Sequence, residues 1–109
     1  MRAVEYRHNW GSGQTREEEM EEKFGKLLVA HDTSEDYQEE TSSLFFDEKT
    51  DEYVWIDSNG CSCWDGDYDG WALSKEELLT LADKAVQNRY EWRDTAAYLV
   101  GAWVQENIT

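Results

Sequence analysis

Only 19 of the 109 residues are Leu, Ile, Val or Phe, while 25 acidic side chains face 10 basic ones and give a formal net charge of −15. This combination alone is typical of disordered chains, because little apolar surface can be buried against strong charge repulsion. Six Trp and six Tyr compensate, since each such side chain can bury about 150–250 Å². We therefore expect residues 1–109 to form a single small acidic domain with an aromatic-rich core.

The net charge limits the partners that this chain can bind. Phosphate backbones and anionic lipid headgroups carry the same sign, so we expect neither direct nucleic-acid binding nor membrane binding. Residues 1–10 contain two Arg and no apolar run, and no later stretch approaches the roughly 20 apolar residues of a membrane span. Cys61 and Cys63 are too close to close a disulfide loop and too few for a secreted scaffold. We expect a cytoplasmic protein, and the sequence implies no particular oligomeric state.

Capping signals and apolar periodicity predict three helices. Thr15 and Glu18 have the spacing of a capping box, and Gly25 would end the short helix that follows them. Ser74 and Glu77 have the same spacing at the start of a second helix. A further apolar stripe predicts a helix at the C-terminal end of the chain. The predicted helices span about residues 16–24, 75–87 and 90–106.

The clearest hairpin signal joins residues 42–47 and 52–57, because apolar side chains alternate along both segments. A strand over residues 26–33 precedes the hairpin, and residues 3–6 have a weaker strand pattern. Residues 58–71 are rich in Gly, Asn, Asp and Ser and predict a long loop. We therefore expect an α+β fold, namely a three-stranded antiparallel meander with a short N-terminal helix and two C-terminal helices packed on one face.

Residues 65–76 match the pattern D-x-[DN]-x-[DN]-G-x₅-E and resemble the calcium loop of an EF-hand. Calcium takes six to eight oxygen ligands, and Gly70 would permit the sharp bend of such a loop. The resemblance implies calcium as a ligand of this segment. The implied ligands are the side chains of Asp65, Asp67, Asp69 and Glu76, together with the Trp71 carbonyl.

The surroundings of this motif leave a second interpretation open. An EF-hand loop follows a helix, whereas residues 52–63 are predicted to form a strand and a turn. In that interpretation residues 65–70 are a solvated acidic turn, and Glu76 and Glu77 only favour the start of the following helix. We expect no cofactor other than the calcium that the motif suggests.

The chain has no clear catalytic residues. Its carboxylates are so numerous that none stands out as a general acid or base. The anionic surroundings of Cys61 and Cys63 disfavour the thiolate that a cysteine nucleophile needs. Gly11-Ser12-Gly13 lacks the Lys and the strand-to-helix setting of a phosphate-binding loop. We therefore expect that the protein is not an enzyme.

The segment 52–63 combines a strand with a Gly60-Cys61-Ser62-Cys63 turn. In this respect the chain resembles small acidic accessory proteins encoded by actinobacteriophages. The resemblance covers about residues 26–64. It implies an accessory protein that acts inside a bacterial host cell.

These observations favour a protein that binds a host protein and inhibits or modulates it, either to counteract host defence or in transcription. Mimicry of a nucleic acid would direct the acidic surface to a basic, nucleic-acid-binding partner. The alternative is a calcium-binding module built on residues 65–76. Trp and Tyr side chains in predicted loops are candidate anchors, because these residue types are enriched at interface hot spots. The candidate partner-binding residues are Trp64, Tyr68, Trp71, Glu35, Asp36, Glu39 and Glu40.

Overall fold

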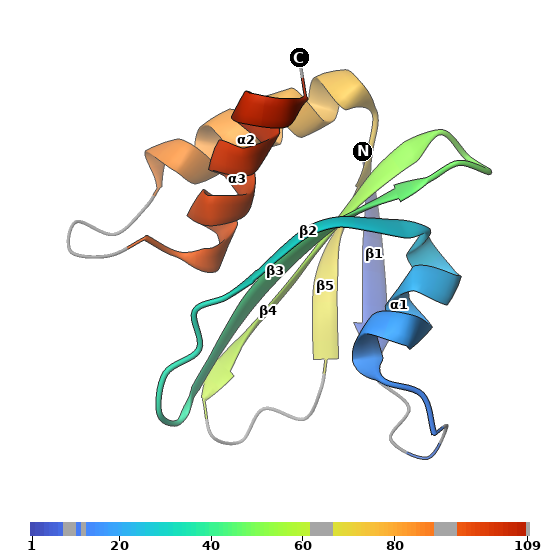
Figure 1. Cartoon of the computed structure of the whole chain (residues 1–109). Coiled ribbons are helices and arrows are strands. Elements are labelled where there is room, and N and C mark those ends of the chain that lie inside the picture. Colours follow the sequence, from blue (N-terminus) through green and yellow to red (C-terminus); the bar gives the residue numbers. More distant parts are fainter. Residues whose placement is uncertain (8–10, 12, 62–66, 89–93, 109) are drawn as a thin grey trace.

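The computed structural model describes residues 1–7, 11, 13–61, 67–88 and 94–108, which form an antiparallel sheet with helices on both of its faces (Figure 1). The sheet has five strands in the order β1-β5-β4-β3-β2, and all neighbours are antiparallel. In chain order the elements are β1 (Arg2–Arg7), α1 (Arg16–Phe24), β2 (Lys26–Asp32), β3 (Gln38–Asp47), β4 (Glu52–Cys61), β5 (Asp67–Leu73), α2 (Lys75–Gln87) and α3 (Ala96–Asn107).

The predicted three-stranded meander is wrong, because the sheet also contains β1 and β5. The sequence predicts a loop over residues 58–71. In the structure, residues 58–61 are the last residues of β4, and residues 67–71 belong to β5. Tyr68 is buried between the exposed Asp67 and Asp69, as expected for the alternation of a strand, and at the end of β5 both Ala72 and Leu73 are buried, because the two faces of the sheet each carry a core. β5 pairs with β1 on one side and with β4 on the other. Backbone hydrogen bonds on both edges therefore hold this charged segment in the sheet.

The helices cover opposite faces of the sheet, so the prediction that they pack on one face is also wrong (Figure 1). Both faces can be covered because Leu44 and Phe45, which are neighbours in β3, are both buried and point to opposite faces. The core under α1 contains Tyr6, Met20, Phe24, Phe45, Val54, Ile56, Tyr68 and Ala72. The core under α2 and α3 contains Leu44, Trp55, Leu73, Leu78, Ala82, Val100 and Val104.

The helix starts agree well with the sequence patterns. Both predicted capping boxes are present, and α2 has the predicted bounds. α3 begins later than predicted, because Thr95 is its N-cap and accepts a hydrogen bond from the Tyr98 N–H at 3.0 Å. The preceding residues 89–93 lie outside the described residues. No helix in the described part of the chain is long and apolar enough to cross a membrane.

Gly70 lies opposite Ile56 of β4, where an added side chain would meet the β4 backbone. A Cβ atom at this position would lie 1.8 Å from the Trp55 carbonyl oxygen and 2.9 Å from the Ile56 Cα. Both distances are far below a van der Waals contact, and both involve backbone atoms. The glycine therefore has a role in the strand pairing itself, which differs from the bend in a metal loop that the motif suggests.

We expect Gly70→Ala to destabilise the fold by at least about 2 kcal/mol, because the added methyl group forces β5 and β4 apart. Urea denaturation followed by tryptophan fluorescence measures this loss. Gly13→Ala is the matched control, since Gly13 has a φ of 80° but no atom within 4 Å of an added Cβ. The control should lower the free energy of unfolding by only about 1 kcal/mol, which is the cost of a Cβ atom in the left-handed conformation. Equal losses in the two variants would contradict the steric role of Gly70.

Candidate functional site

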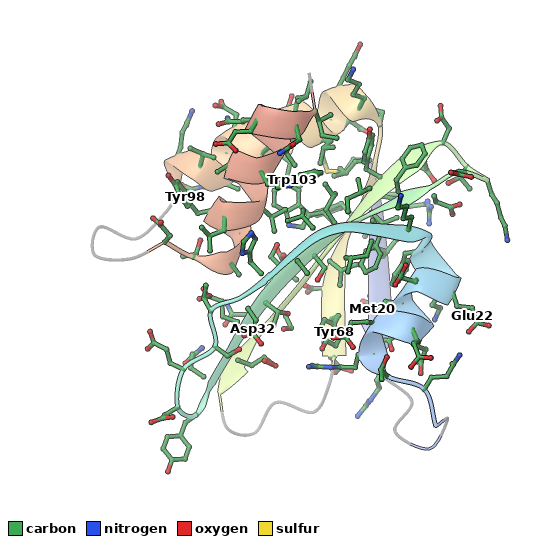
Figure 2. The ribbon with its side chains drawn as sticks, viewed as in Figure 1. Met20, Glu22, Asp32, Tyr68, Tyr98 and Trp103 are labelled. Atoms are coloured by element: carbon green, nitrogen blue, oxygen red, sulfur yellow. The ribbon has the colours of Figure 1, made fainter. Side chains whose placement is uncertain are left out.

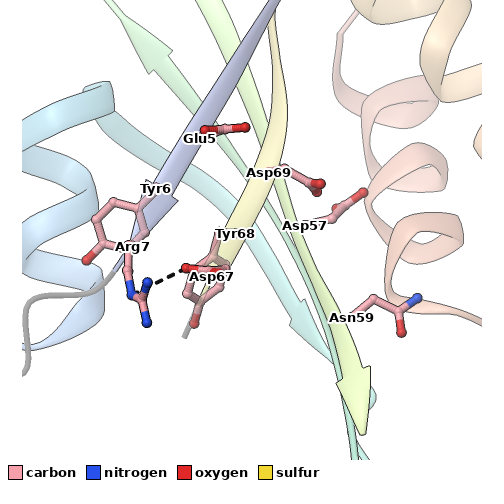
Figure 3. A pocket seen from close by; sticks show the side chains of 8 residues that line it. All are labelled: Glu5, Tyr6, Arg7, Asp57, Asn59, Asp67, Tyr68 and Asp69. Carbon is pink, nitrogen blue, oxygen red and sulfur yellow. Dashed lines mark ion pairs between the residues drawn. The ribbon is translucent and has the colours of Figure 1, made fainter. Parts of the chain in front are cut away.

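A hollow of about 800 Å³ opens at the end of the sheet where β1 ends and β5 begins (Figure 3). Carboxylates dominate its polar lining, and they come from β1, β5 and β4, which are adjacent in the sheet although β1 is far from the other two in the sequence. The lining residues are Glu5, Tyr6, Arg7, Asp57, Asn59, Asp67, Tyr68 and Asp69.

The strand register brings three of these carboxylates into one line. Asp69 lies opposite Glu5 on one side and opposite Asp57 on the other. Figure 3 shows the three side chains next to one another on β1, β5 and β4. Cβ atoms of directly opposite residues are about 4.5–5.5 Å apart, and like charges at this spacing repel. We call Glu5, Asp69 and Asp57 the carboxylate row.

Within the described ranges, no ion pair joins the carboxylate row to a basic side chain. The basic residue in the hollow is Arg7, whose Nε lies 3.5 Å from Asp67 Oδ1, opposite it in the sheet (Figure 3). Among the residues that the structure describes, the row is therefore a concentration of negative charge without an ion-pair partner.

Asp57 is the most enclosed member of the row. The Trp55 indole N–H donates to Ser42 Oγ at 2.7 Å and to Asp57 Oδ1 at 3.1 Å. Burial raises the pKa of Asp57 to about 6, and the nearby charges of Asp69 and Glu40 also raise it. Hydrogen bonds with Ser42 and Trp55 act in the opposite direction but do not cancel the effect of burial. Keeping the row fully charged at neutral pH therefore costs free energy.

Trp71 lies on the same face of β5 as Asp67 and Asp69, because residues two apart in a strand point to the same side. Its side chain is 41 % exposed, which is unusual for the largest apolar residue type. It thus adds apolar surface beside the charged groups. We call Glu5, Asp57, Asn59, Asp67, Asp69 and Trp71 the acidic face.

Tyr68, a candidate anchor in the sequence analysis, lies in β5 and is buried. Its side chain is only 6 % exposed and lies on the α1 side of the sheet, in the same core as Met20 (Figure 2). Its hydroxyl accepts a hydrogen bond from Arg16 Nη1, and the guanidinium lies 5.8 Å from the ring centre. The reason is the alternation of β5, which turns Tyr68 to the opposite face from its two aspartate neighbours. The other predicted anchor, Trp64, lies outside the described residues.

The residues of the predicted calcium motif do not form a loop over positions 67–73. Asp67, Asp69 and Trp71 follow one another along β5, where residues two apart are separated by roughly 6–7 Å. Glu76 lies in the first turn of α2, and Asp65 lies outside the described residues. Among the described residues, no group of three or more His, Cys, Asp or Glu side chains is arranged to hold a metal ion.

The predicted acidic cluster at positions 35–40 separates into two parts at the hairpin between β2 and β3. Glu35 and Asp36 are exposed. Glu39 is half-buried, accepts a hydrogen bond from Ser34 Oγ at 3.0 Å, and lies 3.9 Å from Arg16 Nη1. Glu40 accepts hydrogen bonds from the Ala96 N–H at 3.1 Å and from the Thr33 hydroxyl. Glu40 therefore connects the hairpin to the start of α3 and has a structural role.

Sequence reasoning did not identify Glu5, Asp57 and Asn59 as part of one site with Asp69. Glu5, Asp69 and the pair Asp57 and Asn59 stand in three different segments, and their proximity depends on the pairing of β5 with both β1 and β4. The alternation of polar and aromatic residues over 67–69 is the sequence signal of such a strand, but the same aspartates match the calcium motif and obscure it. Comparison of the chain with known protein families, curated proteins and solved structures finds no match. The function of the chain is therefore inferred from the geometry of the acidic face.

The raised pKa of Asp57 predicts an unusual pH dependence of stability. Its folded-state value of about 6 is above the ordinary 3.8, so the folded protein binds this proton more tightly than the unfolded chain. Stability should increase as pH falls through about 6 and decrease as pH rises. We expect Asp57→Asn to raise the melting temperature near pH 7.5 and to reduce the difference in melting temperature between pH 7.5 and about pH 5.

Glu48→Gln is the matched control for this measurement, because it makes the same change in net charge at an exposed turn position. Differential scanning calorimetry at the two pH values compares the variants directly. If Glu48→Gln changes the pH dependence as much as Asp57→Asn does, the net charge alone is responsible and the assignment to Asp57 is wrong.

Proposed function

We propose that this chain is an accessory protein that binds a basic host protein through the acidic face and thereby inhibits or modulates it. The observation that carries the proposal is the carboxylate row, in which Glu5, Asp69 and Asp57 lie side by side without an ion pair to any described basic residue. Like charges directly opposite one another destabilise a sheet, so the row costs free energy in the unbound protein. A cationic partner would remove that cost when it binds.

Charge complementarity of this kind favours Arg or Lys side chains from the partner. A guanidinium can bond two carboxylate oxygens at once, and such paired hydrogen bonds are among the strongest in proteins. The hollow of about 800 Å³ leaves room for such a side chain above the row. Trp71, at 41 % exposure, offers an apolar contact of the type that dominates binding energy in interfaces. The net charge of −15 would accelerate the encounter with a basic surface.

Mimicry of a nucleic acid is the mode of binding that this arrangement favours. Neighbouring strands are about 4.8 Å apart, so the carboxylate row presents negative charges at intervals of about 5 Å. The charges along one nucleic-acid strand have a spacing of the same order, about 3.4 Å along the helix axis. A basic groove that binds phosphates could therefore accept the row. The resemblance to phage accessory proteins favours a partner in a bacterial host.

We expect Asp69→Asn to weaken binding of a fluorescently labelled arginine-rich peptide about tenfold, because Asp69 is the central charge of the row. The same variant should raise the melting temperature, since it removes the repulsion on both sides of Asp69. Fluorescence anisotropy and calorimetry measure the two effects. Binding should decrease steeply with salt, and double-stranded DNA should compete for the peptide.

Glu48→Gln is again the control, because it removes one charge from an exposed turn away from the acidic face. It should change the peptide affinity by less than about twofold. An equal loss of affinity in both variants would show that only net charge attracts the peptide. That result would refute the proposed role of the carboxylate row.

A further inference from the structure

The hairpin between β2 and β3 ends in an exposed aromatic residue. Tyr37 is 83 % exposed, and its φ of 64° is in the left-handed region. The turn is closed by two backbone hydrogen bonds of 2.9 Å, in which Glu35 and Gln38 each donate to the carbonyl of the other. The hairpin reaches away from α1 and from the pair α2 and α3 (Figure 1). The tip thus presents a tyrosine ring to the solvent.

The fold itself gains little from this tyrosine. A left-handed backbone conformation is unfavourable for a residue with a Cβ, and turns commonly place Gly or Asn there. The high exposure of Tyr37 means that packing does not compensate for this cost. Unfavourable backbone conformations that persist are concentrated at functional sites, so this outlier points to a function for the side chain.

The backbone on either side of the tip is held by side-chain hydrogen bonds. The Ser34 N–H donates to Asp32 Oδ1 and the Glu40 N–H donates to Ser34 Oγ, both at 2.9 Å. The Thr33 N–H donates to the Glu40 carbonyl at 3.0 Å. Asp32, which accepts the first of these bonds, is the last residue of β2 and lies where the strand enters the turn segment (Figure 2). The tyrosine is therefore presented on an ordered support, which lowers the entropy lost on binding.

The tip is strongly acidic, because no Lys or Arg occurs between Asp32 and Glu48 and the two residues before Tyr37 are exposed acids. It also lies at the same end of the sheet as the acidic face. Glu40, which follows the turn, pairs with Asn59, and Asn59 lines the hollow. One partner surface could therefore contact both the tip and the carboxylate row.

We propose that Tyr37 is an aromatic anchor that inserts into a pocket of a folded protein partner whose rim carries Arg or Lys side chains. The inference rests on the proposed function and adds a second contact to it. Tyrosine provides a large and rigid contact area with few rotatable bonds. A cation above its ring adds attraction, and the carboxylates of Glu35 and Asp36 complement the same basic rim.

Photocrosslinking tests this inference with the full chain expressed in an actinobacterial cell. The photoreactive residue p-benzoylphenylalanine replaces Tyr37 in one variant, Trp71 in a second and Glu48 in a control. We expect positions 37 and 71 to crosslink to one protein, with the attachment point of position 37 beside Arg or Lys residues in the partner. The control at position 48 should give no crosslink to that protein.

The outcomes separate the anchor from the proposed function. Crosslinking from position 71 without crosslinking from position 37 would refute the anchor and leave the acidic face intact. Attachment of position 37 to a different protein, or to a site without basic residues, would also refute the anchor. If neither position 37 nor position 71 crosslinks to a protein, both the aromatic anchor and the proposed function of the acidic face are refuted.

Affinity for the purified crosslinked partner provides the second readout. Tyr37→Gly should lower the affinity for the partner at least tenfold. The melting temperature of this variant should equal or exceed that of the wild type, because glycine adopts the left-handed conformation without the penalty that a Cβ atom brings. Asp51→Gly is the matched control, since Asp51 is the other described residue with a side chain at positive φ, at 57° in the turn between β3 and β4. Retained affinity in Tyr37→Gly, or a loss of its stability, would overturn the inference.

Discussion

The pairing of β5 with both β1 and β4 determines most of this structure. β5 connects the N-terminal strand to the rest of the sheet, since the order is β1-β5-β4-β3-β2. It also aligns Glu5 and Asp57 with Asp69, so the carboxylate row exists only when both pairings form. The close approach of the Gly70 backbone to the Trp55 carbonyl makes this pairing sensitive to a single methyl group. The same contact thus supports the fold and assembles the candidate site.

A chain with few aliphatic residues stabilises this charged sheet through aromatic contacts. Under α1, Phe24 lies 6.0 Å from Tyr6 in an edge-to-face arrangement and 5.9 Å from Phe45, measured between ring centres. On the opposite face the Trp55 ring is buried, and its N–H is hydrogen-bonded to Ser42 and Asp57. Large rings bury much surface per residue and form favourable pairs. This packing offsets the repulsion that the carboxylate row introduces.

The parts of the structure that depend on local signals could be predicted from the sequence. The capping boxes at Thr15 and Ser74 and the hairpin around residues 42–57 are examples, because each depends on residues close together in the chain. β5 could not be predicted in the same way, since its aspartates match a calcium motif and obscure its alternation. The carboxylate row requires the register of distant strands. Tyr37 was missed because no sequence rule predicts a tyrosine at a position that favours glycine.

The carboxylate row also links binding to folding. Its three members come from three different strands, and Glu5 is far from the other two in the sequence, so an unfolded chain or an acidic peptide would carry the charges without their alignment. A ligand that binds only the folded state stabilises that state by mass action. A basic partner on the row would therefore recover the free energy that the row costs the free protein. The position of the Tyr37 tip at the same end of the sheet would extend this coupling to β3 and, through the Glu40 bond to the Ala96 N–H, to α3.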